Sequence, residues 1–258
     1  MNKLDAKGLK AGYGKKEVLR GIDISMGEGE FCALLGLNGS GKTTLLKALC
    51  GLIPAKEGCC RIDGKPYLEF NERKRSRLIS YTPQRHSVIS GTTLLDAVLM
   101  GYNPYLPLLS SPGRRERLSA SAALERVGFI GMDGTGFDEL SEGQKQLVIL
   151  ARAIVQESPV MLFDEPVSSL DFVNCHHVLR LIRDIIRENK RAGLITLHDP
   201  NLALYYCDRV LLIDKGVIAG EILPERTPLP QIRERLSLLY GSIDVLEYDE
   251  SYYMVKRS

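Results

Sequence analysis

The sequence lacks tryptophan, and only 7% of its 258 residues are aromatic, so any stacking surface must rest on single tyrosine or phenylalanine side chains. It also lacks an excess of either charge. The 34 lysines and arginines are balanced by 32 aspartates and glutamates, which argues against nucleic-acid binding through a broad basic field. No apolar run approaches the ~18 residues of a membrane span. The polar first residues are not typical of a secretory signal.

The six cysteines show neither a C-x-x-C pair nor a histidine at zinc-binding spacing. We therefore expect reduced thiols in a cytosolic protein rather than disulfides or a metal site. Cys32 and Cys50 lie in apolar stretches, which is typical of small core residues. The adjacent Cys59 and Cys60 are expected to pack in a strand.

The first 85 residues alternate short apolar runs with turn residues, which predicts a β-rich start followed by an α/β core. A glycine-rich loop follows one buried strand, and a helix follows the loop. We expect this helix to carry Leu45, Leu49 and Leu52 on one face, with Gly51 near its end. The strands expected in this part are residues 4–12, 18–25, 31–35 and 78–82.

Residues 86–159 have a different character, with proline- and glycine-rich connections and helical periodicity. We interpret them as a helical insertion in the α/β domain. The apolar face of the expected helix at residues 142–156 comprises Leu147, Leu150, Ala151 and Ile154.

Strand and helix alternation resumes after the insertion. The helix that follows residue 171 has an apolar stripe, and we expect His176 and His177, which lie outside the stripe, to be solvated. The last ~38 residues are too short for an independent core, so they are expected to pack on the main domain. The strands expected here are residues 160–163, 194–197, 209–213 and 217–221.

The run GLNGSGKT, from Gly36 to Thr43, fits the pattern G-x-x-x-x-G-K-[ST] between a strand and a helix. Its glycines let backbone N–H groups turn inward around phosphates, and the start of the helix adds a favourable dipole. Lys42 is placed to reach the β- and γ-phosphates, and the Thr43 hydroxyl to ligate Mg²⁺. The motif predicts a phosphate-binding loop.

A later apolar strand ends in two carboxylates, Asp164 and Glu165. In a chain that holds a phosphate loop, the first of these is expected beside the magnesium ion. The second is expected to polarise a water for in-line attack on the γ-phosphorus.

The segment LSEGQ, residues 140–144, leads into the expected helix at residues 142–156 and forms its start. Ser141 and the backbone N–H of Gly143 fall at a helix N-terminus, which favours anions. Ser141 and Gln144 also have the spacing of a capping box. Both interpretations stay open, because a phosphate can dock against a capped helix start.

Together these motifs resemble those of ATP-binding-cassette (ABC) ATPases, the motor subunits of ABC transporters, over essentially the whole chain. The resemblance implies that Glu165 is the general base, that Gln84 contacts the metal and the attacking water, and that His198 touches the γ-phosphate. It implies Mg²⁺ ligation by Thr43, Gln84 and Asp164. It implies ATP binding by Tyr13, Gly36, Asn38, Gly39, Ser40, Gly41, Lys42, Thr43, Thr44, Ser141, Gly143, Gln144 and Asp171.

The resemblance also implies partners. Such proteins form a head-to-tail homodimer with two ATP molecules at the interface, where Tyr13 stacks on adenine and Asp171 lies at the dimer seam. Ser141 and Gly143 then serve the ATP held by the other protomer. Integral-membrane permease subunits, and indirectly a substrate-binding protein, complete the assembly, with the ATPase peripheral on the cytoplasmic face of the membrane. Nucleic acid is not an expected partner.

The implied fold is α/β, of the P-loop NTPase type. A mixed, mostly parallel sheet forms the core, with an N-terminal antiparallel β arm and an inserted α-helical subdomain. We expect a single ABC ATPase domain over residues 1–258. Its parts are a core at residues 1–85 and 160–222, the helical signature subdomain at residues 86–159, and a C-terminal extension at residues 223–258.

A narrower resemblance is to importers of iron–siderophore, haem and cobalamin-type cargo. It is carried by TLLDAVLMGYNPY at residues 93–105, by HDPNLALYYCDRV at residues 198–210, and by LLYG at residues 238–241. The chain departs from the family pattern at Glu142, where glycine is usual, and at Leu147, where arginine is usual.

Three other classes of protein are alternatives to an importer ATPase. A soluble ABC ATPase, acting in cluster assembly or on ribosomes, shares every motif and is the main alternative. An exporter motor usually carries its own membrane spans, which are missing from this sequence. A P-loop GTPase or kinase lacks the segment at residues 140–144.

Overall fold

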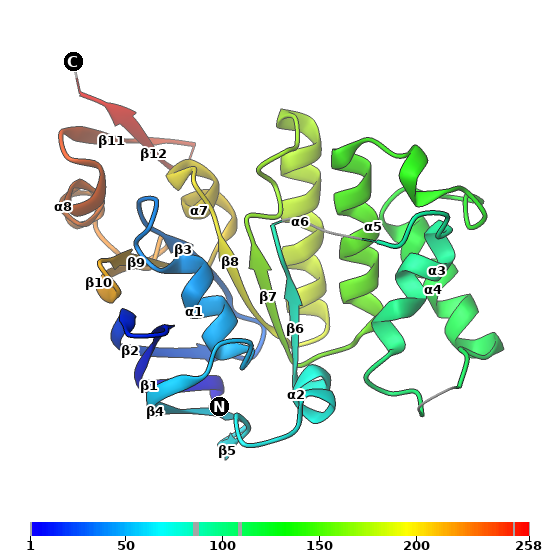
Figure 1. Ribbon diagram of the computed structural model, residues 1–258. Helices are drawn as coiled ribbons and strands as arrows, with labels where there is room; N and C mark the ends of the chain where they lie inside the picture. Colours follow the sequence, from blue (N-terminus) through cyan, green and yellow to red (C-terminus); the bar gives the residue numbers. More distant parts are fainter. Residues whose placement is uncertain (1, 85–87, 108–109, 250, 258) are drawn as a thin grey trace.

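The structure is a computed structural model that describes residues 2–84, 88–107, 110–249 and 251–257. A six-stranded sheet lies at its centre (Figure 1). The order across the sheet is β10 (Val217–Ile222), β9 (Arg209–Asp214), β3 (Phe31–Leu35), β8 (Ala192–Thr196), β7 (Val160–Asp164) and β6 (Ile79–Thr82). Neighbouring strands from β9 to β6 are parallel, and β10 pairs antiparallel with β9 at one edge. This is the mixed, mostly parallel sheet that the sequence predicts.

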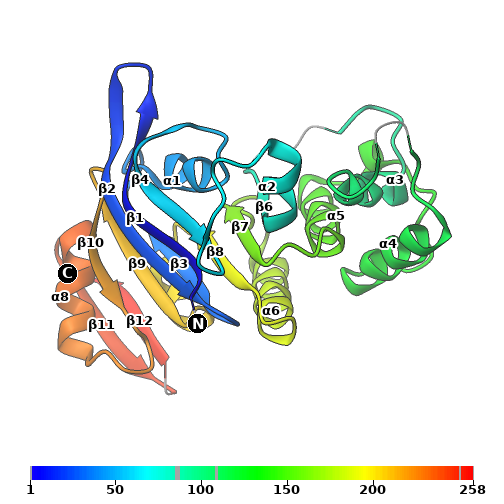
Figure 2. The ribbon, with the colours of Figure 1, turned by 90° about the horizontal axis from the view of Figure 1, so that it is seen from below.

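An antiparallel sheet forms the N-terminal arm (Figure 2). Its side chains share one apolar core with the first helix and with one face of the central sheet. Cys60 is buried in this core on β4, as expected of strand packing, and all six cysteines are free thiols. The strands of the arm are β1 (Asn2–Tyr13), β2 (Lys16–Gly27), β4 (Ala55–Ile62) and β5 (Lys65–Pro66). The helices in this part of the chain are α1 (Lys42–Leu49) and α2 (Glu72–Leu78).

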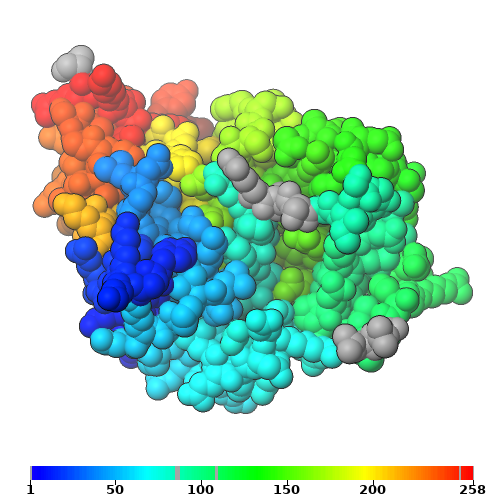
Figure 3. Space-filling model, in the orientation of Figure 1, coloured from blue at the N-terminus to red at the C-terminus, as the bar shows by residue number. Residues whose placement is uncertain are grey.

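The helical insertion forms a lobe at one side of the central sheet, well separated from the β arm in both ribbon views (Figures 1 and 2). The space-filling view shows the lobe and the arm at opposite ends of one face (Figure 3). The expected start of the insertion, between residues 85 and 86, lies outside the described residues. The lobe contains α3 (Leu94–Leu99), η1 (Met100–Tyr102), α4 (Arg114–Arg126), η2 (Phe137–Glu139) and α5 (Glu142–Val155).

The single apolar stripe expected for α5 is only partly right. Leu150 and Ala151 are buried, whereas Leu147 and Ile154 are half-buried. Much of the rest of α5 is buried too, because the helix packs against α3 and α4 within the lobe and against α6 (Phe172–Glu188). A helix packed from several sides does not show a single buried stripe.

The first helix after the glycine-rich loop is shorter than expected. It ends at Leu49, and Leu52 lies beyond it with 63% of its surface exposed. The reason is Gly51, whose φ of 71° is a left-handed conformation that commonly ends helices. Leu52 is therefore a surface residue and not part of the buried face.

The C-terminal residues pack on the core, as expected from their length. Helix α8 (Leu229–Tyr240) contacts β9 and β10, and the hairpin of β11 (Ile243–Tyr248) and β12 (Ser251–Lys256) contacts α8 and α7 (Pro200–Tyr206). Asn201 on α7 makes two hydrogen bonds with the backbone of Met254, one at 2.7 Å and one at 3.3 Å. These bonds hold β12 against α7. Among the described residues, no helix has the length and apolarity needed to cross a membrane.

Candidate active site

The glycine-rich loop joins the buried strand β3 to α1. Gly39 and Gly41 have φ angles of 79° and 112°, a region that favours glycine. A side chain at Gly36 would collide with the backbone oxygen of Ile213 at 2.4 Å. The glycines therefore allow both the turns and the close packing that place this loop at the end of the sheet.

The loop presents hydrogen-bond donors that have no internal partner. No side chain of the described residues caps α1, so the N–H groups of its first turn are available to an anion. The Ser40 hydroxyl is buried and, among the described residues, has no hydrogen-bond partner. Buried polar atoms are rarely left unpaired. A phosphate group satisfies both requirements.

Lys42 lies within the loop and is buried. Its ammonium donates to the backbone oxygens of Gly36 at 2.7 Å and Leu37 at 3.4 Å. Burial lowers the pKa of this ammonium, while the nearby carboxylates of Glu165 and Asp164 act in the opposite direction. The positive charge is thus held at the mouth of the loop, where phosphates would lie.

Asp164 ends β7 and is buried among hydroxyl groups. Its Oδ1 accepts from Thr43 at 3.2 Å and from Thr196 at 3.0 Å, and its Oδ2 accepts from Tyr81 at 3.1 Å. Burial raises the pKa of Tyr81, and the carboxylate of Asp164 adds to that effect.

Sequence reasoning named neither Tyr81 nor Thr196. Both lie at the carboxyl ends of parallel strands beside β7, and Asp164 pairs in register with Thr196. A polar residue at the end of each expected parallel strand was the available signal.

Glu165 follows the strand and meets two other predicted residues. Gln84 Nε2 donates to its Oε2 at 2.5 Å, and His198 Nε2 lies 2.7 Å from its Oε1. The backbone N–H of Glu165 donates to Thr196 Oγ1 at 2.8 Å. Its φ of 50° is unusual for a residue with a side chain. The surrounding bonds hold the carboxylate in this conformation, facing the loop.

A cavity of about 380 Å³ joins the loop to the N-terminal arm. Tyr13, at the end of β1, is 51% exposed and lies at its edge, together with Lys16 and Val18. The predicted residues that line the cavity are Tyr13, Asn38, Gly39, Ser40, Gly41, Lys42, Thr43, Thr44 and Glu165.

The residues of the LSEGQ segment do not line this cavity. Ser141 caps α5 as predicted, because its Oγ accepts from the Gln144 N–H and its own N–H donates to Gln144 Oε1. Gly143 lies in the first turn of the same helix, in the separate lobe (Figures 1 and 2). Asp171 caps α6 and accepts from the Asn174 N–H at 2.9 Å.

A mixed, mostly parallel sheet with a phosphate-binding loop and two carboxylates at the end of one strand defines a P-loop ATPase. A family model described as ABC transporter matches residues 19–168, more than half of the chain. The chain belongs to the ABC transporter family, as its ATP-binding and ATP-hydrolysing subunit.

Relatives and a solved structure agree with this assignment. A Helicobacter pylori protein named as an iron chelatin transport ATP-binding protein is 33% identical over 250 residues, covering 96% of each chain. The zinc transport system ATP-binding protein TroB of Treponema pallidum is 38% identical over 213 residues, covering 82% of this chain and 78% of that protein. A metal-chelate type ABC transporter in an inward-facing conformation is 26% identical with a TM-score of 0.82, covering 98% of this chain and 96% of that one.

Proposed function

We propose that this chain is the ATP-hydrolysing subunit of an importer for metal chelates, of the iron–siderophore, haem or cobalamin type. The observation that supports ATP hydrolysis is that the Glu165 carboxylate contacts both Gln84 and His198 beside the phosphate loop. Support for the cargo class comes from the similar proteins, which are named for iron chelatin, zinc and metal-chelate transport.

In the proposed reaction a water oxygen attacks the γ-phosphorus, and Glu165 accepts one of the protons of the water. The bond from the γ-phosphorus to the bridging oxygen breaks, and ADP and inorganic phosphate leave. Lys42 offsets the charge on the β- and γ-phosphate oxygens during this step. His198 and Gln84 orient the Glu165 carboxylate through the two contacts described above.

The residues present fit a magnesium ion bound with the nucleotide. Thr43 Oγ1 and Asp164 Oδ1 lie 3.2 Å apart, and oxygen ligands of this kind are those that Mg²⁺ prefers. We propose that these two residues and Gln84 hold the ion, which would neutralise phosphate charge.

We propose that two copies of the chain complete the nucleotide site head to tail. The N-terminus of α5, with Ser141 exposed and Gly143 half-buried, favours an anion but lies apart from the phosphate loop of its own chain. A second copy that places this helix start against the loop gives each of two ATP molecules contacts from both protomers.

Glu142 bears on this dimer, because it adds a carboxylate at the same helix start. Its Oε1 accepts from Lys145 at 2.9 Å, and its side chain is 78% exposed. We expect Glu142→Gly to raise the ATP-dependent association constant about two- to five-fold at low salt, since a negative charge near the phosphate of the partner is removed.

The effect is measured as the dimer fraction on size exclusion, in a Glu165→Gln background and at two salt concentrations. Glu142→Gln is the matched control, because it removes the charge and keeps the length of the side chain. Equal dimer fractions for all three proteins at both salt concentrations would show that the side chain faces away from the partner.

A groove of about 400 Å³ between α1, β6 and the helical lobe fits a membrane partner. It is lined by Leu52, Arg75, Met100 and Arg152, and by Tyr81. The Tyr81 hydroxyl also donates a hydrogen bond to Asp164. A partner that contacts Tyr81 in this groove would therefore be connected to the catalytic centre through a single side chain. We propose that permease subunits dock in this groove, with the chain peripheral on the cytoplasmic face of the membrane and a substrate-binding protein on the far side.

Co-purification separates this proposal from its alternative, a soluble ABC ATPase. Tagged chain is extracted with detergent from its native cells, and a polytopic membrane protein is expected to accompany it. We expect Leu52→Glu to abolish that association and leave ATP hydrolysis in solution unchanged, because a charge is placed in the groove.

Leu118→Glu is the control, since Leu118 on α4 is exposed to the same extent, 63%, but lies outside the groove. If the membrane protein still co-purifies with the Leu52→Glu variant, the proposal that it docks in this groove is wrong. Soluble partners alone, with no membrane protein, would favour the soluble ABC ATPase.

A further inference from the structure

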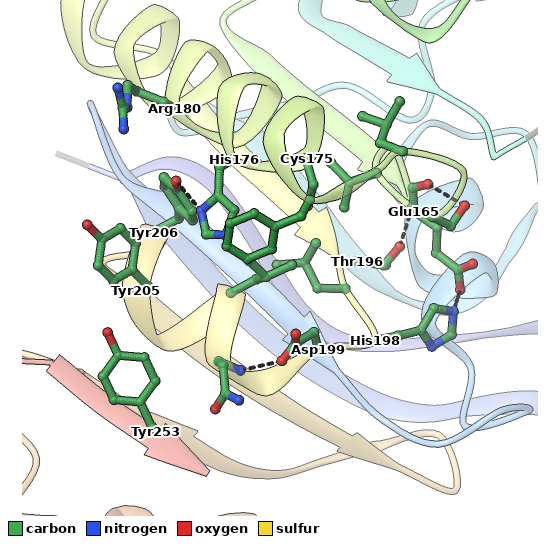
Figure 4. Close-up of a pocket in the computed structure, with 17 residues that line it drawn as sticks. Glu165, Cys175, His176, Arg180, Thr196, His198, Asp199, Tyr205, Tyr206 and Tyr253 are labelled. Carbon is green, nitrogen blue, oxygen red and sulfur yellow. Dashed lines mark hydrogen bonds and ion pairs between the residues drawn. The ribbon is translucent and has the colours of Figure 1, made fainter. Parts of the chain in front are cut away.

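A larger cavity, of about 730 Å³, lies between α6, α7 and β12 (Figure 4). Of the residues that the structure describes, Glu165 alone lines both the nucleotide cavity and this one. Its volume falls in the range of small-molecule sites, about 300–1,000 Å³. Leu170, Leu197 and Leu202 contribute apolar surface to its lining. Glu165 and His198, which serve the proposed nucleotide chemistry, line one end of this cavity, and that chemistry makes no use of the rest.

Aromatic rings form one continuous wall of the cavity. The Phe172 and His176 ring centroids are 4.3 Å apart, His176 and Tyr206 are 5.6 Å apart, and Tyr206 and Tyr205 are 4.9 Å apart. Tyr253 comes from β12, which the Asn201 bonds hold in place (Figure 4).

The prediction that His176 and His177 are solvated is right for His177, which is exposed, and wrong for His176, which is half-buried. Its Nδ1 and the Tyr206 hydroxyl oxygen are 2.7 Å apart, and its ring packs on Phe172. Phe172 itself is 78% exposed. A fixed aromatic wall with an exposed phenyl ring gains stability when a planar molecule covers it.

The charges of the cavity are distributed unevenly. Glu165 is paired with His198, and Asp199 accepts from the Asn201 N–H at 2.8 Å. Arg180, towards the end where Tyr205 and Tyr206 lie, is hydrogen-bonded to the Tyr206 side chain but is paired with no carboxylate in the described part of the chain (Figure 4). A guanidinium binds carboxylates through two parallel hydrogen bonds. At its aromatic end the cavity therefore has a cation that no carboxylate of the described residues neutralises.

We propose that this cavity binds a small planar aromatic carboxylate. The ring lies against the wall of Phe172, His176 and Tyr205, and the carboxylate meets Arg180. Because Glu165 and His198 line the same cavity, a bound molecule restrains the catalytic carboxylate and lowers turnover without occupying the ATP site.

The probe is 2-naphthoate, with the uncharged 2-naphthylmethanol as its matched partner. Binding is measured by calorimetry and by naphthalene fluorescence, without ATP, and the absence of tryptophan removes an indole background. We expect saturable one-to-one binding of 2-naphthoate and about ten-fold weaker binding of the alcohol, the difference typical of a charge-assisted hydrogen bond.

Arg180→Gln is expected to weaken 2-naphthoate binding about ten-fold and to leave binding of the alcohol unchanged. Arg117→Gln, at an exposed position on α4, is the control and should change neither affinity. Tyr205→Ala, checked for folding by circular dichroism, is expected to weaken both probes because it removes part of the wall.

Three results would overturn the proposal: no saturable binding of 2-naphthoate, equal affinity for the two probes, or displacement of 2-naphthoate by ATP. In the ATPase assay, saturating 2-naphthoate should lower kcat and leave KM for ATP unchanged. Because binding is read without ATP, it tests the cavity even if the chain proves not to be an importer subunit.

Discussion

Glu165→Gln is expected to leave ATP binding intact and to lower ATP turnover about 10²-fold or more. The amide keeps the shape of the side chain and its place between Gln84 and His198, but it cannot accept the proton of the attacking water. Turnover is measured as phosphate release, and ATP affinity by calorimetry. If ATP can still close the two subunits, the variant should accumulate as a nucleotide-bound dimer on size exclusion.

The matched control is Glu234→Gln, an exposed position on α8 away from both cavities. It should retain the turnover of the unmodified chain. Turnover of Glu165→Gln within a few-fold of that value would remove Glu165 from the role of general base. The Asp164→Asn variant would then test whether Asp164, the other carboxylate at this end of the sheet, accepts the proton instead.

Lys42→Ala is expected to act earlier, at phosphate binding. The ammonium is held inside the loop by two backbone oxygens and faces the space where the β- and γ-phosphates would lie. Loss of a charge-assisted contact should weaken ATP binding about 10- to 100-fold, and turnover should fall as well because the same charge stabilises the transition state.

Affinity is measured by calorimetry in the Glu165→Gln background, so that the nucleotide is not consumed. Lys47→Ala is the control, because Lys47 lies in the last turn of the same helix, away from the loop. Unchanged ATP affinity in Lys42→Ala would contradict the assignment of the phosphate-binding loop. A thermal melt without nucleotide shows whether the buried lysine also supports folding.

The parts of the site that are contiguous in the chain could be predicted from the sequence. The loop from Gly36 to Thr43 depends on glycines whose backbone conformations are local, and the structure finds Gly39 and Gly41 at positive φ. The capping box of Ser141 and Gln144 spans four residues and forms as predicted. Local hydrogen bonds and local backbone geometry need no knowledge of the fold.

Some features of single elements depended on their neighbours. The apolar pattern of α5 could not show burial on several sides, because the sequence does not say which helices will pack around it. Leu52 fits the helical period of α1, yet Gly51 ends the helix before it. Periodicity predicts that a helix exists, while its partners and its end depend on tertiary contacts and on single glycines.

The sequence by itself determined the phosphate loop, the strand that carries Asp164 and Glu165, and the family pattern that connects them. Only the tertiary structure decided that Thr196 and Tyr81 hold Asp164, since these residues come from strands far apart in the chain that pair in parallel. It alone brought Tyr253 opposite the rings of α6 and α7 and placed Arg180 at that end of the cavity. Such contacts depend on strand order and on packing between distant segments, and neither is written in the spacing of residues along the chain.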